Sequence, residues 1–313
     1  MKLIRAMKSI FLPINHNGAT DPRKFQPALP LPIGYSRERL LAALEPASID
    51  GSALGEMAAY VQADIERFIH TLSLAPENIR GKALEIGANP YFMTLLFRKF
   101  RPDLEFTLVN YFGGDTHEAV QRVSFPGFDH DPQDIGLAYH NANLELTALP
   151  FEENSFDLVL FCEVLEHLTV DPLHAMQELK RVLKPGGRLV LTTPNAARLE
   201  NVSAFVEGRN IYDPYSKYGP YGRHNREYTR HELSLLLTHC GFEIETFYTA
   251  NVHDDIAVNA EHAAAISAII NGIPNRKYDL GQYLFTSSIN RRKADVGRPS
   301  WLFRSYPPEE MSS

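Results

Sequence analysis

Two hydrophobic periods alternate along the chain from about residue 80 onward. Short apolar runs predict buried strands, and apolar residues that recur every three or four positions between them predict helices. The predicted strands span residues 83–86, 104–110, 156–161, 188–193, 242–249 and 282–289. The predicted helices span residues 93–100, 172–183 and 229–240. This alternation is typical of an α/β domain with a mostly parallel sheet and helices on both faces.

The first 79 residues follow a different pattern. Residues 1 to about 36 contain many prolines and no sustained periodicity, which predicts an irregular arm. Helical periodicity then covers residues 37–44 and 54–74. These helices either pack against the sheet or cap a ligand crevice, and the pattern leaves both roles open. We therefore expect an N-terminal arm and helical cap over 1–79, an α/β domain over 80–290 and a tail over 291–313.

Two long connections interrupt the alternation. Residues 111–142 are rich in Gly, His, Asp and Pro, which predicts an irregular connection rather than a helix. Residues 195–227 are rich in Tyr, Arg, Gly and Asn and form the second connection. Because long connections inside a domain often carry function, both are candidates for contact with a ligand.

The stretch around the first predicted strand has the features of a ligand-binding turn. Leu84 and Ile86 are its apolar positions, and Gly87 allows the backbone to turn sharply into the next helix. In open α/β sheets the ligand crevice lies beyond the carboxyl ends of the strands. We therefore expect Glu85 and Gly87 at the rim of such a crevice.

Composition narrows the classes of function. The net charge is −7 and no run of Lys and Arg carries interleaved aromatics, which argues against a nucleic-acid partner. Cys162 and Cys240 lie in apolar contexts, so neither a disulfide framework nor a cysteine-rich zinc site is expected. No apolar run is long enough to span a bilayer, and the basic N-terminus makes a poor signal peptide. We therefore expect a cytoplasmic protein.

An ordered set of motifs resembles the class I S-adenosylmethionine-dependent methyltransferases, in particular the type 11 and type 12 small-molecule or glycan enzymes. The resemblance covers about residues 80–250. It is carried by Leu84-Glu85-Ile86-Gly87, Leu149-Pro150-Phe151 before Ser155-Phe156-Asp157, Glu163-Val164-Leu165-Glu166-His167-Leu168, Leu183-Lys184-Pro185-Gly186-Gly187 and Cys240-Gly241-Phe242. It implies a Rossmann-like seven-stranded, mostly parallel sheet with an antiparallel last strand, and S-adenosylmethionine as the cofactor.

The first turn also argues against a dinucleotide-dependent oxidoreductase. After Gly87 it lacks the second and third glycines of the Rossmann fingerprint. A pyrophosphate needs close approach to the backbone at this point, and Asn89 followed by Pro90 obstructs it.

The resemblance implies a set of cofactor contacts along the carboxyl ends of the strands. Asn110 stands where the family usually has an acidic residue for the ribose hydroxyls, and an amide offers one acceptor oxygen and a donor nitrogen there. Near the adenine, the spacing leaves either Asn143 with Leu144 or Glu145, and we favour the first. The predicted cofactor-binding residues are Glu85, Gly87, Ala88, Asn89, Asn110, Asn143, Leu144, Cys162 and Glu163.

Two histidines are candidates for a general base, because the near-neutral pKa of histidine suits proton transfer. His167 follows the carboxyl end of the fourth strand, where the resemblance places the donor methyl group; the alternative is a structural role at the start of a helix. His224 lies in the second long connection, on the acceptor side. In the same loop, Arg223 and Arg226 are predicted to bind an anionic group of the substrate and Tyr228 to stack on a ring.

No metal site is expected from the sequence. The clusters Asp129-His130-Asp131 and His253-Asp254-Asp255 consist of neighbours, whose side chains point apart in most backbone conformations. The overall pattern, including residues 298–302, resembles methyltransferases of glycan or secondary-metabolite pathways. We therefore expect methyl transfer to a hydroxyl of a small-molecule or glycan acceptor. A metabolite N-methyltransferase and a non-catalytic binding protein with this fold remain alternatives.

Overall fold

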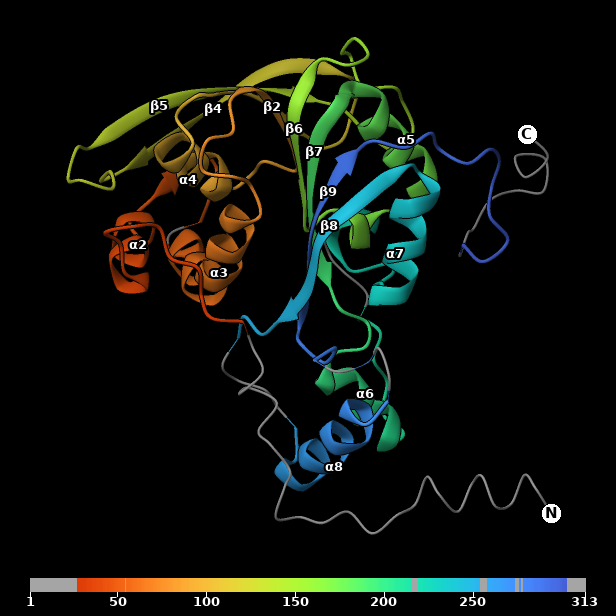
Figure 1. Ribbon diagram of the computed structural model, residues 1–313. Coiled ribbons are helices and arrows are strands. Elements are labelled where there is room, and N and C mark those ends of the chain that lie inside the picture. Colours follow the sequence, from red (N-terminus) through yellow and green to blue (C-terminus); the bar gives the residue numbers. More distant parts are fainter. Residues whose placement is uncertain are drawn as a thin grey trace, which may run out of the picture.

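The described residues form one nine-stranded mixed sheet with helices on both faces (Figure 1). The computed structural model describes residues 27–53, 55–214, 219–253, 258–273, 276 and 278–302. The strand order is β1-β4-β5-β3-β2-β6-β7-β9-β8. Residues 1–26 of the predicted irregular arm and residues 303–313 of the tail therefore lie outside the described residues.

The strands and helices have the following bounds. The strands are β1 (Ser48–Ile49), β2 (Gly81–Ile86), β3 (Leu104–Asn110), β4 (His117–Phe125), β5 (Gln133–Asn141), β6 (Phe156–Cys162), β7 (Leu183–Pro194), β8 (Phe242–Ala250) and β9 (Tyr283–Asn290). The helices are α2 (Arg37–Leu44), α3 (Glu56–Ser73), α4 (Phe92–Phe100), α5 (Pro172–Val182), α6 (Leu199–Val206), α7 (Arg230–His239) and α8 (Ala260–Asn271), with short 3₁₀ turns η3 (Leu165–His167) and η4 (Pro220–Gly222).

Seven of the strands have the predicted arrangement. β5, β3, β2, β6 and β7 pair in parallel, and β9 runs antiparallel between β7 and β8. The predicted Rossmann-like sheet with an antiparallel last strand is thus confirmed. The sheet extends beyond seven strands, because β4 and β1 add antiparallel pairs at the β5 edge.

The extra edge corrects the prediction for residues 111–142. This stretch is a hairpin, β4 and β5, rather than an irregular connection. Its buried or half-buried apolar positions, Ile135, Leu137 and Tyr139 on β5, recur at every second residue, which is the period of a strand. The prediction was wrong because it rested on the composition of the whole stretch. The turn-forming residues lie before β4, at Gly113 and Gly114, and between β4 and β5, in 126–132.

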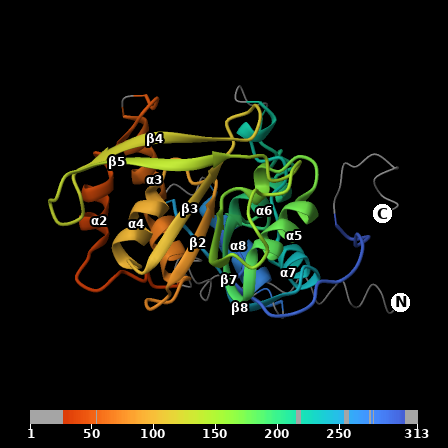
Figure 2. The same ribbon diagram turned by 90° about the horizontal axis from the view of Figure 1, so that it is seen from above.

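Alternating side chains of the central strand β6 divide the core in two. Leu158 and Leu160 join the cluster formed with α2, α3 and α4, whereas Val159 and Phe161 join the cluster formed with α5 and α7. Figure 2 shows these two groups of helices on opposite sides of the strands. The N-terminal helices therefore share a hydrophobic core with one face of the sheet.

Two helices that the sequence pattern did not predict, α6 and α8, pack together beyond one end of the sheet (Figure 1). Their small cluster contains Leu199, Ile266 and Leu280. α6 lies within residues 195–227, so the second long connection is partly helical. Among the described residues, no helix combines the length and the apolar character needed to cross a bilayer.

Candidate functional site

The turn after β2 is built around a glycine that no other residue replaces without strain. Gly87 has φ +70°, and a Cβ added there would lie 2.6 Å from Cγ2 of Val164. Its backbone N–H donates to the carbonyl oxygen of Val109 at 2.8 Å, which ties the turn to the end of β3. The predicted sharp turn is therefore present, at the carboxyl ends of β2, β3 and β6.

Glu85 is the penultimate residue of β2, and its side chain is buried. Only 5% of it is exposed, and its Oε2 accepts a hydrogen bond from Thr94 Oγ1 at 2.6 Å. Burial raises the pKa of Glu85 to about 8, because the charged carboxylate loses its hydration. At neutral pH the carboxyl group is therefore mostly protonated.

The cavity beside this turn is small and is closed by the N-terminal helix α3. Its volume is about 30 Å³, the space of about one water molecule. Ligand pockets usually measure about 300–1,000 Å³. From α3 the lining includes Tyr60, Arg67 and Phe68, which face the turn residues. A nucleoside-sized ligand therefore requires that α3 move from this position.

Arg67 holds this cap in place through contacts within α3. Its guanidinium donates to Asp64 Oδ1 and to the hydroxyl of Tyr60, both at 2.8 Å, and it is 4% exposed. The guanidinium also lies 5.0 Å from the centre of the Phe68 ring. The polar and aromatic groups of the cap thus form one connected unit over the crevice.

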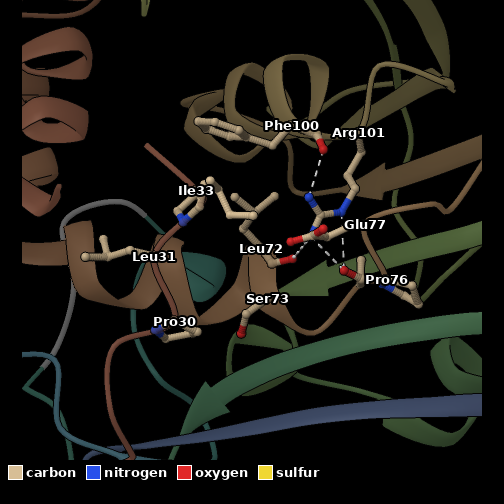
Figure 3. Close-up of a pocket in the computed structure, with 11 residues that line it drawn as sticks. Pro30, Leu31, Ile33, Leu72, Ser73, Pro76, Glu77, Phe100 and Arg101 are labelled. Carbon is tan, nitrogen blue, oxygen red and sulfur yellow. Dashed lines mark hydrogen bonds between the residues drawn. The ribbon is translucent and has the colours of Figure 1, made fainter. Parts of the chain in front are cut away.

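A larger hollow lies elsewhere, between residues 30–33 and the C-terminal ends of α3 and α4 (Figure 3). Its volume is about 590 Å³. The guanidinium of Arg101, beside this hollow, donates to the carbonyl oxygens of Leu72, Ala75 and Phe100. Because α4 runs away from the turn at Gly87, this hollow lies toward the amino ends of the strands. It is therefore separate from the predicted crevice.

Asn110 is at the predicted position but is used to hold the turn. Its Oδ1 accepts from the backbone N–H of Asn89 at 2.8 Å, and its Nδ2 donates to the hydroxyl of Tyr91 at 3.0 Å. The hydroxyl of Tyr91 donates in turn to Gln121 Oε1 of β4 at 2.5 Å, and Asn89 Nδ2 donates to the same oxygen at 3.3 Å. Asn89, beside Ala88, thus lies at the crevice but contacts the added hairpin.

Asn143 and Glu145, the two alternatives near the adenine position, also have internal partners. Glu145 accepts backbone N–H bonds from Thr169, Val170 and Asp171 at 2.6–2.8 Å, so its carboxylate fixes the loop before α5. Asn143 donates from Nδ2 to the hydroxyl of Tyr221 at 3.0 Å. Leu144, between them, is buried. The loop-fixing role of Glu145 favours Asn143 and Leu144 for the cofactor.

Cys162 ends β6 and lines the cavity, and Glu163 follows it in the chain. Burial raises the pKa of the Cys162 thiol to about 12, so this cysteine is not a nucleophile at neutral pH. Glu163 has φ +55°, a strained conformation for a residue with a side chain, and its Oε1 accepts from Thr192 Oγ1 at 2.8 Å. Burial and the neighbouring Glu166 raise the pKa of Glu163 to about 8.

The structure brings the two predicted histidines together with a buried carboxylate. The rings of His167 and His224 have centres 5.1 Å apart, and His167 Nε2 lies 3.8 Å from Glu166 Oε1. Glu166 is fully buried. Burial and the charge of His224 lower the pKa of His167. Burial opposes the charge on His224, but its bond to Glu227 and the nearby Glu166 raise its pKa overall.

The three predicted substrate residues are placed differently from one another. Arg223 lies beside the histidine pair, since its carbonyl oxygen is 2.9 Å from His167 Nδ1. Arg226 forms an ion pair with Glu232 at 2.7 Å. Tyr228 is 1% exposed and belongs to the core on the α5 and α7 side, which favours packing over the predicted contact with substrate.

Several residues at the site escaped prediction. Gln121 was not predicted because the hairpin that carries it was not recognised. Tyr60 and Arg67 were not predicted because helical periodicity does not show which element the apolar face of a helix contacts. Glu166 was quoted only as part of a motif. The available signal was the spacing of Glu163, Glu166 and His167, which places two acidic groups and an imidazole within five residues after a buried strand.

Comparison with known proteins identifies a family. A family model described as a methyltransferase domain matches residues 57–246, more than half of the chain. The malonyl-[acyl-carrier protein] O-methyltransferase of Paenibacillus sp. (strain JDR-2) is 28% identical over 272 residues, which cover 77% of this chain and 91% of that protein.

Other relatives match over shorter stretches. The ubiquinone/menaquinone biosynthesis C-methyltransferase UbiE of Shewanella frigidimarina is 36% identical over 147 residues, which cover 47% of this chain and 53% of that protein. A solved S-adenosylmethionine-dependent methyltransferase of Thermotoga maritima, described as a possible histamine N-methyltransferase, has 16% identity and a TM-score of 0.46. The match covers 76% of this chain and 96% of that one.

Proposed function

Because the chain belongs to the methyltransferase domain family and takes its methyl group from S-adenosylmethionine, we propose that it methylates a hydroxyl of a small-molecule or glycan acceptor. The cofactor supplies a methyl group made electrophilic by a positively charged sulfur. The protein has to align the acceptor oxygen with that methyl group, exclude water and remove the hydroxyl proton.

The observation that carries the proposal is the pairing of His167 and His224 at the carboxyl end of β6. The lowered pKa of His167 keeps its imidazole neutral near pH 7, so it can accept a proton. In the proposed step the acceptor oxygen bonds to the methyl carbon, the carbon–sulfur bond breaks onto sulfur, and the hydroxyl proton passes to Nε2 of His167.

The loop on the acceptor side supports a polar acceptor. Arg223 lies beside His167, and Tyr221 lies at the other side of the same loop, where it bonds to Asn143. A guanidinium binds phosphate or carboxylate groups, and a tyrosine ring stacks on sugars. The O-methyltransferase of Paenibacillus, matched over most of its length, supports oxygen as the accepting atom.

The N-terminal region enters the proposal as a movable cap. α3 contributes Tyr60, Arg67 and Phe68 to the walls of the crevice, whose volume of about 30 Å³ is too small for the cofactor. The turn has the kinds of residue that would hold the methionine end of the cofactor, namely a glycine, Gly87, and the buried carboxyl group of Glu85. We therefore assign α3 to a cap that opens for binding.

Two measurements test the proposal. Calorimetry with S-adenosylmethionine and S-adenosylhomocysteine should show one site per chain. A screen of sugar, phenol and amine acceptors with methyl-deuterated cofactor, read by mass spectrometry and NMR, should give an O-methyl product. An N-methyl product would show that the acceptor group is an amine and not a hydroxyl. Failure of both ligands to bind at millimolar concentration would indicate a non-catalytic binding protein.

A further inference from the structure

Glu166, His167 and His224 can offer one ligand atom each to a single ion. One carboxylate oxygen and one nitrogen of each ring lie within 4.8 Å of one another. From this geometry we infer that the three residues form a binding site for a divalent first-row transition-metal cation. Two imidazoles and one carboxylate are a ligand set that such cations accept while keeping further positions open.

His167 is oriented as a metal ligand would be. Its Nδ1 lies 2.9 Å from the carbonyl oxygen of Arg223, which only accepts hydrogen bonds. Nδ1 therefore carries the ring proton, and the lone pair is on Nε2, the atom that lies 3.8 Å from Glu166 Oε1. Metal-binding histidines usually donate their second ring N–H to a carbonyl or carboxylate in this way.

The ring of His224 is supported by a carboxylate, that of Glu227. Its Nδ1 lies 3.1 Å from Glu227 Oε1, and Glu227 is held by Asn201 Nδ2 at 3.1 Å and by Arg198. The carboxylate fixes the proton on Nδ1, so the lone pair of this ring is also on Nε2. A carboxylate behind a histidine increases the basicity of the ligand atom.

Glu166 supplies an oxygen whose bonding is incomplete. The side chain is fully buried, and Oε2 accepts from Thr193 Oγ1 at 2.9 Å. Oε1 is buried, and no described residue donates a hydrogen bond to it. A buried carboxylate oxygen without a donor is costly, and a cation between it and the two imidazoles would complete its coordination.

The expectation of no metal rested on residues adjacent in sequence. In the first of those clusters, Asp129 forms ion pairs with Arg39 and Lys99. In the second, Asp254 and Asp255 lie outside the described residues. The present cluster joins the end of β6 to a loop 57 residues later, counted from His167 to His224. Two of its ligands follow the strand next to β2, which carries the turn at Gly87.

The role of the cation in catalysis rests on the proposed hydroxyl acceptor, whereas its binding does not. A bound divalent cation lowers the pKa of an oxygen that coordinates it, which favours the attacking alkoxide form. With the cation bound, both imidazoles are ligands, and a water molecule on the cation would take the hydroxyl proton; without the cation, Nε2 of His167 takes it, as in the proposed step.

The test is cation binding by the full chain after removal of metals with a chelator. Titration calorimetry with Mn²⁺ and Zn²⁺ should show one equivalent per chain. We expect His167→Ala and His224→Ala to lose this binding, and Glu227→Gln to weaken it by about 10- to 100-fold through the supporting bond. His231→Ala, an exposed histidine on α7, is the control and should bind as the unchanged protein does.

A second measurement needs no variant. Co²⁺ added to the metal-free wild-type chain should give one equivalent of d–d absorption bands with the intensity typical of bound imidazole nitrogen. A spectrum of the free aqueous ion, or equal binding in all variants, would overturn the site. Equal rates of methyl transfer to a hydroxyl by the metal-free and the metal-loaded chain would overturn the catalytic role of the cation but keep the proposed function. Stoichiometric cation binding without any O-methyl product would overturn the proposed function but keep the cation site.

Discussion

The side-chain oxygen of Asn110 accepts a hydrogen bond from the backbone N–H of Asn89 at 2.8 Å. The end of β3 thereby fixes the turn after β2, at the place where the family resemblance implies a contact with the ribose. The amide nitrogen of Asn110 is used as well, by the hydroxyl of Tyr91. In this structure both polar groups of the Asn110 side chain therefore hold the turn after β2.

Replacement of Asn110 by Asp should therefore destabilise the fold rather than improve the site. The position is 3% exposed, and a carboxylate there cannot donate to Tyr91. We expect Asn110→Asp to lower the free energy of unfolding by about 1–3 kcal/mol, the cost of a buried polar mismatch. Urea unfolding measures this. The exposed Asn154→Asp is the control, and tighter cofactor binding by Asn110→Asp at unchanged stability would instead indicate a direct ribose contact.

The hydrophobic pattern was sufficient for six of the strands, β2, β3, β6, β7, β8 and β9, and for the turn at Gly87. Both depend on local signals, namely short apolar runs and a glycine after a strand. It was not sufficient for the β4–β5 hairpin, whose connecting residues resemble an irregular loop by composition. It also could not bring His224 beside Glu166, because that contact depends on how the loop after β7 folds back over the end of β6.

The sequence did not predict what α3 packs against, for a related reason. Amphipathic periodicity predicts a helix with one buried face, but the partner of that face is set by tertiary packing. In the structure this face lies both on the core and over the cavity, so the two roles that the sequence left open coexist. Phe68 packs with Phe92 in the core and also lines the cavity together with Tyr60 and Arg67.

Binding of the cofactor should be limited by opening of α3. Tyr60 lines the cavity, and its truncation removes part of the cap together with the hydrogen bond from Arg67 and the ring contacts with Phe68 and Phe92. We expect Tyr60→Ala to raise the association rate constant for S-adenosylmethionine severalfold, because less contact must be broken before the ligand enters. Stopped-flow fluorescence measures this rate.

The matched control for the cap is Tyr212→Ala, since that tyrosine is 76% exposed on the loop after α6. Its association rate should equal that of the unchanged chain. Slower association or weaker binding in Tyr60→Ala alone would mean that Tyr60 contacts the bound cofactor instead of obstructing it.

The turn at Gly87 offers a test that separates backbone strain from steric conflict. Gly87 and Gly114 have similar φ values, +70° and +75°, but only Gly87 has a neighbour within 4 Å of an added Cβ. Both alanine variants should lose about 1–2 kcal/mol through the left-handed backbone. Gly87→Ala should lose more, and should also lose cofactor binding, because Cγ2 of Val164 must move.

The double variant Gly87→Ala with Val164→Ala completes this cycle. Removal of the valine methyl groups should restore part of the stability lost by Gly87→Ala, which a thermal unfolding series can measure. Strictly additive losses, or equal losses at positions 87 and 114, would show that the close contact with Val164 does not constrain the turn.

The buried carboxyl group of Glu85 should make stability depend on pH. Its folded-state pKa of about 8 exceeds the ordinary value of 4.5, so between these values the folded chain binds more protons than the unfolded chain. The contribution of Glu85 is favourable at low pH and is lost as pH rises from 4.5 to 8, with a slope of up to about 1.4 kcal/mol per pH unit. Glu85→Gln keeps a neutral group at this position, so its advantage over wild type should grow with pH and level off above pH 8. Chemical unfolding from pH 5 to 9 measures the difference in unfolding free energy between Glu85→Gln and wild type. The exposed Glu153→Gln is the control. A difference that stays constant with pH would contradict the buried, protonated state of Glu85.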